Sequence, residues 1–329
     1  YIQKYHFREK GRYKMIKTYL KQLKENGTGL SSYLDMIMCT LRYGASPNNY
    51  KNFGFKELNS RERSTYVTNG LSRKIIKKFN DPAYIDFFED KTKFAKRFSE
   101  YFGREWISTR NLDYNAFLEF VEGKQKFIYK PTENAQGQGI IVFDDLQNLK
   151  KIYEQISNLR GEAILEEWIE QHRELDKVYS KAINCLRVIT FCKNDTVKFL
   201  AGGVTWGNGK KIANASASGI VSPVNFENGV LEKPAADFNG GCYKQHPITN
   251  VELVGLQLPY WNETKDMLIR AAKEIPQVAY IGWDVAITPN GPVLIEGNTT
   301  PGYRYYQIPL HMENKCGNRA VYESCLNER

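Results

Sequence analysis

The chain has 329 residues, 42% of them hydrophobic and 25% charged, and its formal net charge is +9. This composition is typical of a soluble globular protein of two or three domains, and no apolar run approaches the roughly 20 residues that a membrane-spanning helix needs. The six cysteines show no CxxC spacing and the four histidines form no zinc-binding pattern, so we expect buried thiols and a cytoplasmic protein.

The N-terminal stretch is basic. Residues 1–26 carry eight Lys or Arg against two Glu, with apolar residues at helical spacing: Tyr13, Ile16, Leu20 and Leu23. Two interpretations stay open, a solvated helix packed on its own domain and a basic amphipathic helix at the anionic inner face of a membrane. We expect no nucleic-acid partner, because no recognition motif is present.

The first hundred residues are predicted to be mainly helical. Asn59 to Arg63 is typical of a helix start, Asp81-Pro82 breaks the chain, and a further helix beginning near Lys91 ends near Gly103. No βαβ alternation, internal repeat or low-complexity linker interrupts this pattern. We therefore predict a helical N-terminal region over residues 1–88.

Two β-rich runs within residues 127–143 flank a polar loop. Lys130 ends the first run, and Gly137 and Gly139 allow the loop to fold backbone N–H groups over phosphates, with the lysine as a point charge. A plain hairpin turn is the alternative.

A helix follows, which we expect Asp144 or Asp145 to cap. The next segment, residues 163–172, reads as a strand that runs into a polar crossing. A purine ring fits here, with backbone groups around Trp168 at its edge and Glu166 near its exocyclic amine. Taken alone, the segment is equally typical of a strand followed by a domain crossover.

Residues 201–225 are rich in Gly, Ser and Asn, which suit a backbone that approaches a ligand closely. The candidates for phosphate or acceptor contacts are Lys211, Asn214, Ser218 and Gly219. A β-hairpin at residues 207–209 followed by a surface loop explains the stretch equally well.

Residues 280–304 are predicted to form a hairpin around Asn290, because Asn-Gly supplies the positive φ values of tight turns. Symmetric folding places Asp284 opposite Glu296, and it pairs Val285 with Ile295. A bulge at Gly291 would shift this register by one.

Opposed carboxylates repel unless a cation or a shared proton offsets them. Asn298 points to the same face as Glu296, because side chains alternate along a strand. Together Asp284, Glu296 and Asn298 form an all-oxygen site that suits Mg²⁺ held with phosphates. A solvated hairpin edge is the alternative.

In this order and at these separations, the segments resemble the ATP-grasp superfamily. The pattern combines KP-x₅-G-x-G from Lys130, ILEEWI from Ile164, and D-x₁₁-E-x-N-T-T-P-G from Asp284. The last of these is similar to D-alanine–D-alanine ligases. Four shorter segments resemble the sugar-transfer-associated ATP-grasp family, whose members accompany bacterial exopolysaccharide and capsule biosynthesis: residues 184–187, 245–249, 258–261 and 281–284.

The resemblance implies an α+β fold in which two lobes, over 89–168 and 169–329, clamp ATP after the helical region. It implies nucleotide contacts from Lys91, Lys130, Gly137, Gln138, Gly139, Glu166, Glu167, Trp168, Ile169 and His172. It also implies that Asp284, Glu296 and Asn298 bind one or two Mg²⁺ ions.

The resemblance further implies an ADP-forming carboxylate–amine ligase that acts through an acyl phosphate. Related ligases often carry an arginine two residues before the metal-binding aspartate, where this chain has Gly282. Arg187, in an apolar strand, is the natural substitute, with a structural salt bridge as the alternative. Lys211 and Gly302 are the other catalytic candidates.

The expected substrates are small-molecule or sugar-linked carboxylates and amines, such as an amino acid and a uronic acid of a surface polysaccharide. Two alternatives stay open: a kinase that stops at phosphoryl transfer, and a non-catalytic nucleotide-binding scaffold.

Overall fold

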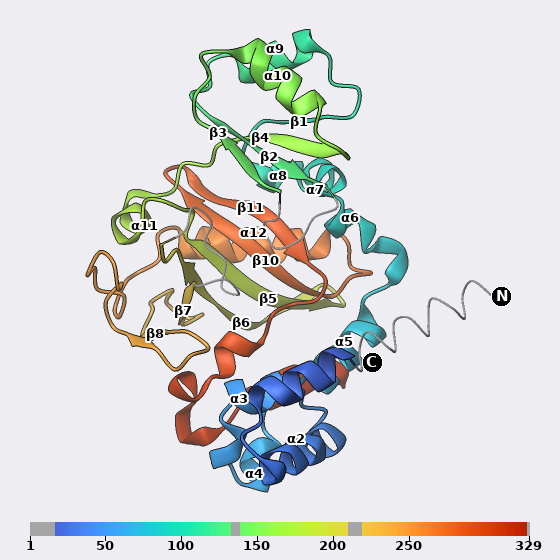
Figure 1. Ribbon diagram of the computed structural model, residues 1–329, viewed down its shortest axis with the longest axis vertical. Helices are drawn as coiled ribbons and strands as arrows, with labels where there is room; N and C mark the ends of the chain where they lie inside the picture. Colours follow the sequence, from blue (N-terminus) through green and yellow to red (C-terminus); the bar gives the residue numbers. More distant parts are fainter. Residues whose placement is uncertain (1–16, 133–138, 210–218, 328–329) are drawn as a thin grey trace, which may run out of the picture. The chain divides into compact units, whose positions relative to one another are not determined.

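The computed structural model describes residues 17–132, 139–209 and 219–327. The chain forms two compact units: unit 1 comprises residues 1–78 and 303–329, and unit 2 comprises residues 79–302. The C-terminal segment therefore packs with the N-terminal helical region rather than with the sheets (Figure 1). The three-part division predicted above, with boundaries after residues 88 and 168, stays a prediction.

Unit 1 is helical, and the helical character of its N-terminal part was predicted. Its α-helices are residues 17–26, α2 (Leu30–Tyr43), α3 (Pro47–Asn52), α4 (Ser60–Arg63), α5 (Asn69–Phe79) and α13 (Arg319–Leu326). Short 3₁₀ turns connect them: η1 (Phe55–Glu57), η3 (Arg304–Gln307), η4 (Pro309–His311) and η5 (Glu313–Lys315).

A salt bridge inside unit 1 ties α2 to α4. Arg63 binds both oxygens of Asp35, at 2.7 and 2.8 Å, and Tyr50 donates to the same carboxylate at 2.8 Å. Burial alone would raise the pKa of Asp35, but these donors outweigh it and lower that pKa. The ion pair therefore fixes which face of α2 turns inward.

Unit 2 begins with short helices and a small antiparallel sheet. The helices are η2 (Pro82–Tyr84), α6 (Asp86–Glu89), α7 (Lys91–Arg97) and α8 (Ser99–Phe102). The sheet has the order β1 (Trp106–Ser108), β4 (Ala163–Glu167), β2 (Phe127–Pro131), β3 (Ile141–Phe143). Helices α9 (Tyr114–Val121) and α10 (Leu149–Ser157) lie together over this sheet (Figure 1), where Phe117 and Phe120 pack against Phe127.

Among the described residues, the larger sheet of unit 2 has seven antiparallel strands in the order β11-β10-β5-β6-β7-β8-β9. Their bounds are β5 (Cys185–Lys193), β6 (Thr196–Trp206), β7 (Ile220–Pro223), β8 (Ala235–Ala236), β9 (Cys242–Tyr243), β10 (Tyr280–Thr288) and β11 (Gly291–Asn298). Helix α11 (Arg173–Val178) connects the two sheets, and α12 (Trp261–Lys273) packs beside the larger one.

One face of the larger sheet is a hydrophobic core. Trp283 of β10 is fully buried, with ring contacts to Phe88 at 6.0 Å and Phe98 at 5.5 Å. A Cβ on Gly297 of β11 would come within 2.7 Å of Phe88, so only glycine fits there. Because side chains alternate along a strand, the neighbours of Trp283 and Gly297 point to the opposite face. That face carries the candidate site.

Two local predictions were wrong in detail. The hairpin pairs Val285 with Leu294, not with Ile295, because the ladder shifts between Asp284 and Val285 rather than at Gly291. Helix α10 is capped by Asn148, whose side chain accepts from the Lys151 N–H at 3.0 Å, rather than by Asp144 or Asp145.

Candidate active site

The predicted metal-binding side chains come together on the larger sheet. Asp284 lies directly opposite Glu296 on β11 and opposite Arg187 on β5, so the three form one row across three strands. The Asn298 amide donates to Glu296 at 3.2 Å. Burial and the negative charge of nearby Asp284 raise the pKa of Glu296. A cation beside the two carboxylates would offset their repulsion, so the pair favours a bound cation.

Arg187 provides that positive charge in this structure. Its Nε and Nη2 atoms both donate to the Asp284 carboxylate, and Nη2 lies 4.0 Å from Glu296. The structural salt bridge, which was the alternative role of Arg187 in the sequence analysis, is therefore present. Each carboxylate oxygen has a second lone pair, so Asp284 can hold Arg187 and ligate a metal at once.

A second charged group lies on the small sheet. Lys130 and Arg104 both approach one oxygen of Glu166, each at 2.7 Å, and the Arg104 and Glu166 side chains are each 3% exposed. Burial alone would raise the pKa of Glu166, yet the two cations outweigh it and lower that pKa. Burial lowers the pKa of Lys130 although Glu166 opposes that effect.

Arg104 was not predicted from the sequence. It donates to the carbonyls of Phe102 and Leu294, both at 2.8 Å, and its guanidinium carbon lies 3.4 Å from the centre of the Phe102 ring. Its remaining nitrogen, Nη2, is buried and makes no hydrogen bond to the residues that the structure describes. Arg104 precedes β1 and contacts Glu166 only because β1 pairs with β4. No local sequence pattern around Arg104 therefore predicts this contact.

Lys91 lies at the start of α7, a helix that contacts both β4 and β11. Burial lowers its pKa, the Glu296 charge opposes that effect, and the Lys130 charge adds to it. Lys91 is therefore electrostatically coupled both to the metal row and to the cations of the small sheet. The start of α7 brings together the two halves of the predicted nucleotide site.

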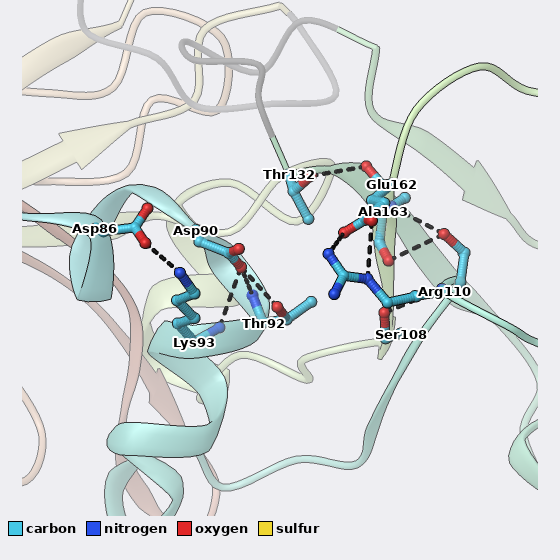
Figure 2. A network of polar contacts seen from close by, with 10 residues as sticks. Asp86, Asp90, Thr92, Lys93, Ser108, Arg110, Thr132, Glu162 and Ala163 are labelled. Carbon is cyan, nitrogen blue, oxygen red and sulfur yellow. Dashed lines mark hydrogen bonds and ion pairs between the residues drawn. The ribbon is translucent and has the colours of Figure 1, made fainter.

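Two polar networks hold the backbone around this site, as Figure 2 shows. Asp90 caps α7 by accepting from the Thr92 N–H at 2.8 Å and the Lys93 N–H at 3.1 Å, which fixes the turn that carries Lys91. Thr132, directly after β2, donates its N–H and hydroxyl to the Glu162 carbonyl, both at 2.9 Å. The stem of the predicted phosphate loop is therefore fixed beside β4.

The segment predicted to hold adenine leaves β4 with its side chains partly buried. Glu167 accepts from the Glu105 N–H at 3.1 Å, and Trp168 lies 4.3 Å below the Lys126 ammonium. Ile169 is partly buried. His172 caps α11 by accepting from the Glu174 N–H at 3.2 Å, which is a structural role.

The other predicted residues divide into two groups. Gly302 lies beside the metal row, since a Cβ built on it would stand 3.9 Å from Arg187 Nη1. Gly139 is described and has a positive φ of 75°. The remaining candidates lie outside the described residues: Gly137, Gln138, Lys211, Asn214 and Ser218.

Gly282, where related ligases often carry an arginine, pairs with Asn298 and faces Pro301. A Cβ there would stand 3.2 Å from the Pro301 Cβ. A long side chain at this position would therefore displace Pro301, so Arg187 is the arginine that this row accommodates.

These residues fit a magnesium–nucleotide complex. Two carboxylates and an amide oxygen are hard oxygen ligands of the kind that Mg²⁺ prefers. No group of three His, Cys, Asp or Glu gathers among the described residues, so the row supplies two carboxylates and depends on Asn298 for its third protein ligand. In the part of the chain that the structure describes, Lys130 and Arg104 share one buried carboxylate, Glu166, so the small-sheet side of the site favours an anion.

Comparison with known proteins agrees with this geometry. A family model described as "Sugar-transfer associated ATP-grasp" matches residues 70–315. No curated protein matches the chain in sequence. None of the helices in the described ranges is long and apolar enough to cross a bilayer.

Three solved structures illustrate the likeness. The ADP complex of purK, an N5-carboxyaminoimidazole ribonucleotide synthetase, is 11% identical and covers 66% of this chain and 46% of its own, with a TM-score of 0.42. The ATP-grasp ligase PsnB with its minimal precursor is 14% identical, and the match covers 86% of this chain and 75% of the PsnB chain, with a TM-score of 0.47. D-alanyl-alanine synthetase A from Vibrio cholerae O1 biovar eltor is 12% identical, and the match covers 73% of this chain and 64% of the synthetase chain, with a TM-score of 0.44.

The chain spans about half the length of the first of these structures. The family match confirms the resemblance predicted from the sequence, together with its α+β fold and helical N-terminal region. The chain belongs to the sugar-transfer associated ATP-grasp family.

Proposed function

We propose that the protein is a carboxylate–amine ligase that forms an amide through an acyl phosphate, with ATP and Mg²⁺. The observation that carries this proposal is the row of Glu296, Asp284 and Arg187, which is coupled through Lys91 to the buried cations around Glu166. This arrangement places oxygen ligands for a metal beside cations for phosphates.

The cations of the small sheet would bind the phosphates of the nucleotide. Lys130 is held by Glu166 in a single orientation, and Arg104 fixes that carboxylate in turn. Because both supporting side chains are buried, Lys130 is positioned before the nucleotide arrives, which lowers the entropy cost of binding. Lys91 would add a second contact from the start of α7.

The larger sheet would hold the metal and the reacting carboxylate. Asp284, Glu296 and Asn298 would ligate Mg²⁺, which supplies charge neutralisation for phosphoryl transfer. Arg187 binds Asp284 through Nε and Nη2, and its Nη1 lies toward Gly302. We assign Nη1 and the Gly302 N–H to the substrate carboxylate and to the oxyanion that forms when the amine attacks.

The bonds balance without a further reactant. A carboxylate oxygen takes the terminal phosphoryl group and ADP leaves. The amine nitrogen then attacks the acyl carbon, and the bond between that carbon and the phosphate oxygen breaks. Amide, phosphate and a proton are released.

The family description associates the fold with sugar transfer, which supports a sugar acid as one substrate. An amino acid as the other substrate is carried over from the expectation stated above. Surface polysaccharide biosynthesis, as expected from the sequence, is part of this proposal and rests on that description alone.

Trapping with hydroxylamine tests the acyl phosphate directly. The protein is incubated with ATP, Mg²⁺, hydroxylamine and one candidate carboxylate at a time, drawn from uronic acids and amino acids. The proposal predicts a hydroxamate, identified by mass, in the same amount as the ADP released. A stable phosphorylated product without hydroxamate would instead identify a kinase, and no carboxylate-dependent ADP would identify a scaffold.

Arg187→Lys tests the assigned catalytic role. Losing one oriented donor to an oxyanion lowers kcat by about 10²–10³-fold, whereas binding of Mg²⁺–ATP should stay nearly unchanged. Arg270→Lys is the matched control, because Arg270 and its partner Glu100, 3.2 Å apart, both have exposed side chains. Equal loss of nucleotide binding and turnover in Arg187→Lys would contradict the assignment.

A further inference from the structure

The positive charge of the protein is concentrated in one unit. Unit 1 carries 21 Lys or Arg against 8 Asp or Glu, whereas unit 2 carries 25 against 29. The net charge of +9 therefore arises entirely from unit 1, while the unit with the nucleotide site is slightly acidic. Such an asymmetry indicates an anionic partner for unit 1.

Helix α2 of unit 1 turns an apolar face outward. Asp35, Met36 and Cys39 lie on its inner side, where Arg63 holds the carboxylate. The outer side carries five large apolar residues at helical spacing, with these exposed fractions: Leu30 76%, Leu34 56%, Ile37 38%, Met38 57% and Leu41 76%. At 100° per residue these five span a stripe about 100° wide. We call this stripe the α2 face.

An apolar stripe of this size on a soluble protein marks an interaction site. A second copy of the chain is a poor occupant, because it would bring two strongly basic units together and their like charges would repel. An anionic phospholipid surface satisfies both features, since it accepts apolar side chains at the acyl boundary and attracts Lys and Arg.

A basic hollow adjoins the C-terminal end of the α2 face. It has a volume of about 720 Å³ and is lined by Arg42, Tyr43, Ser60, Arg61, Ser64, Arg319 and Glu323. Arg42 directly follows Leu41, the last residue of the stripe.

The charges in this hollow are only partly balanced. Arg319 pairs with Glu323 at 2.8 Å. Within the described ranges, neither Arg42 nor Arg61 forms an ion pair, and Arg42 lies 5.5 Å from the centre of the Tyr43 ring. Unbalanced arginines beside hydroxyls are suited to a phosphate group.

We propose that unit 1 docks on an anionic phospholipid bilayer, with the α2 face at the acyl boundary and a lipid phosphate in the hollow of Arg42, Arg61 and Arg319. This inference does not depend on the ligase reaction proposed above, and it concerns a different unit. It also differs from the membrane contact expected from residues 1–26, of which residues 1–16 lie outside the described part of the chain.

Vesicle co-sedimentation of the full chain tests the proposal. Phosphatidylcholine vesicles with and without phosphatidylglycerol are compared at low and at high salt. We expect at least about tenfold stronger binding to the anionic vesicles, weakened by salt because surface charges are screened. The variant Leu34→Gln/Met38→Gln/Leu41→Gln should lose about tenfold or more of that binding, since it removes the apolar contact.

Matched controls separate docking from folding. The replaced side chains are exposed, so the variant should keep the circular-dichroism spectrum and melting temperature of the wild type. Ile248→Gln changes an equally exposed residue (51%) of unit 2 and should bind vesicles like the wild type. Arg42→Gln/Arg61→Gln should weaken binding to anionic vesicles only.

Three results would overturn the proposal. The first is equal pelleting with neutral and anionic vesicles, and the second is wild-type binding by the triple variant. The third is a dimer in light scattering that the triple variant breaks, combined with no vesicle binding, because a second copy would then occupy the α2 face.

Discussion

Replacing Glu166 with glutamine is the perturbation whose effect the structure defines most sharply. One oxygen of this carboxylate receives both Lys130 and Arg104 at 2.7 Å, and both the Arg104 and the Glu166 side chains are 3% exposed. The substitution keeps the shape of the side chain but removes its charge. Two cations in the protein interior then lose the carboxylate that they both contact.

Removing one partner of a buried ion pair costs about 3–5 kcal/mol, because the remaining charge stays desolvated. For a unit of the size of residues 79–302, each kcal/mol lowers the melting temperature by about 2–4 °C, so we expect a drop of roughly 6–20 °C. The control is Glu100→Gln, whose partner Arg270 is 61% exposed, and this change should cost less than about 1 kcal/mol.

Thermal unfolding followed by circular dichroism measures both variants. The dependence of the melting temperature on pH in the acid range gives a second measurement. The pKa of folded Glu166 lies below its unfolded value of about 4.3, so its contribution is fully present above that pH and is lost as the pH falls through the folded value. The wild-type and Glu166→Gln melting temperatures should therefore converge as the pH falls below about 4.3. Equal stability of the two proteins at pH 7 would contradict the conclusion that the Glu166 charge stabilises Lys130 and Arg104.

Three further predictions concern the site and the thiols. Lys130→Met removes a charge-assisted contact of about 1.5–3 kcal/mol, so nucleotide affinity measured by calorimetry should fall by about 10–150-fold; unchanged affinity would place the phosphates elsewhere. Asp284→Asn removes a metal ligand, so the Mg²⁺ concentration needed for half-maximal ADP release should rise at least about tenfold, and an unchanged requirement would exclude Asp284 as a ligand. Cys242 and Cys316 are exposed, whereas burial raises the pKa of Cys39 to about 11; a disulfide reagent should therefore modify two thiols quickly in the native protein, and rapid reaction of Cys39 would contradict its burial.

The central hairpin shows what alternation along a strand can predict. The pairing of Asp284 with Glu296 was correct, although the reason was incomplete. The turn is one residue tighter than expected, with Thr288 opposite Gly291, and the additional residue sits in the ladder next to Val285. A period of two identifies the face that a residue occupies, but it does not locate a bulge.

The sequence predicted that Arg187 has an anionic partner, because a charge in an apolar strand needs one; its catalytic role stays a prediction. The structure supplied that partner, Asp284, on the adjacent strand. Arg104 gave no such signal. Its position beside Glu166 depends on the pairing of Trp106 with Glu166, more than fifty residues apart in the chain, which no local pattern encodes.

Unit 1 shows the same limit at the level of a helix. The spacing of Leu30, Leu34 and Leu41 predicts an apolar stripe but not whether the stripe faces inward. Asp35 and Arg63 decide that question, because their salt bridge lies on the opposite side of α2 and turns the stripe outward.

Calorimetric titration of ATP, with and without Mg²⁺, measures directly whether this site binds a magnesium–nucleotide complex. We predict tight binding of ATP when Mg²⁺ is present, loss of that binding on chelation, and strong weakening by Lys130→Met. Absence of ATP binding in the presence of Mg²⁺, or equal affinity with and without the metal, would contradict it.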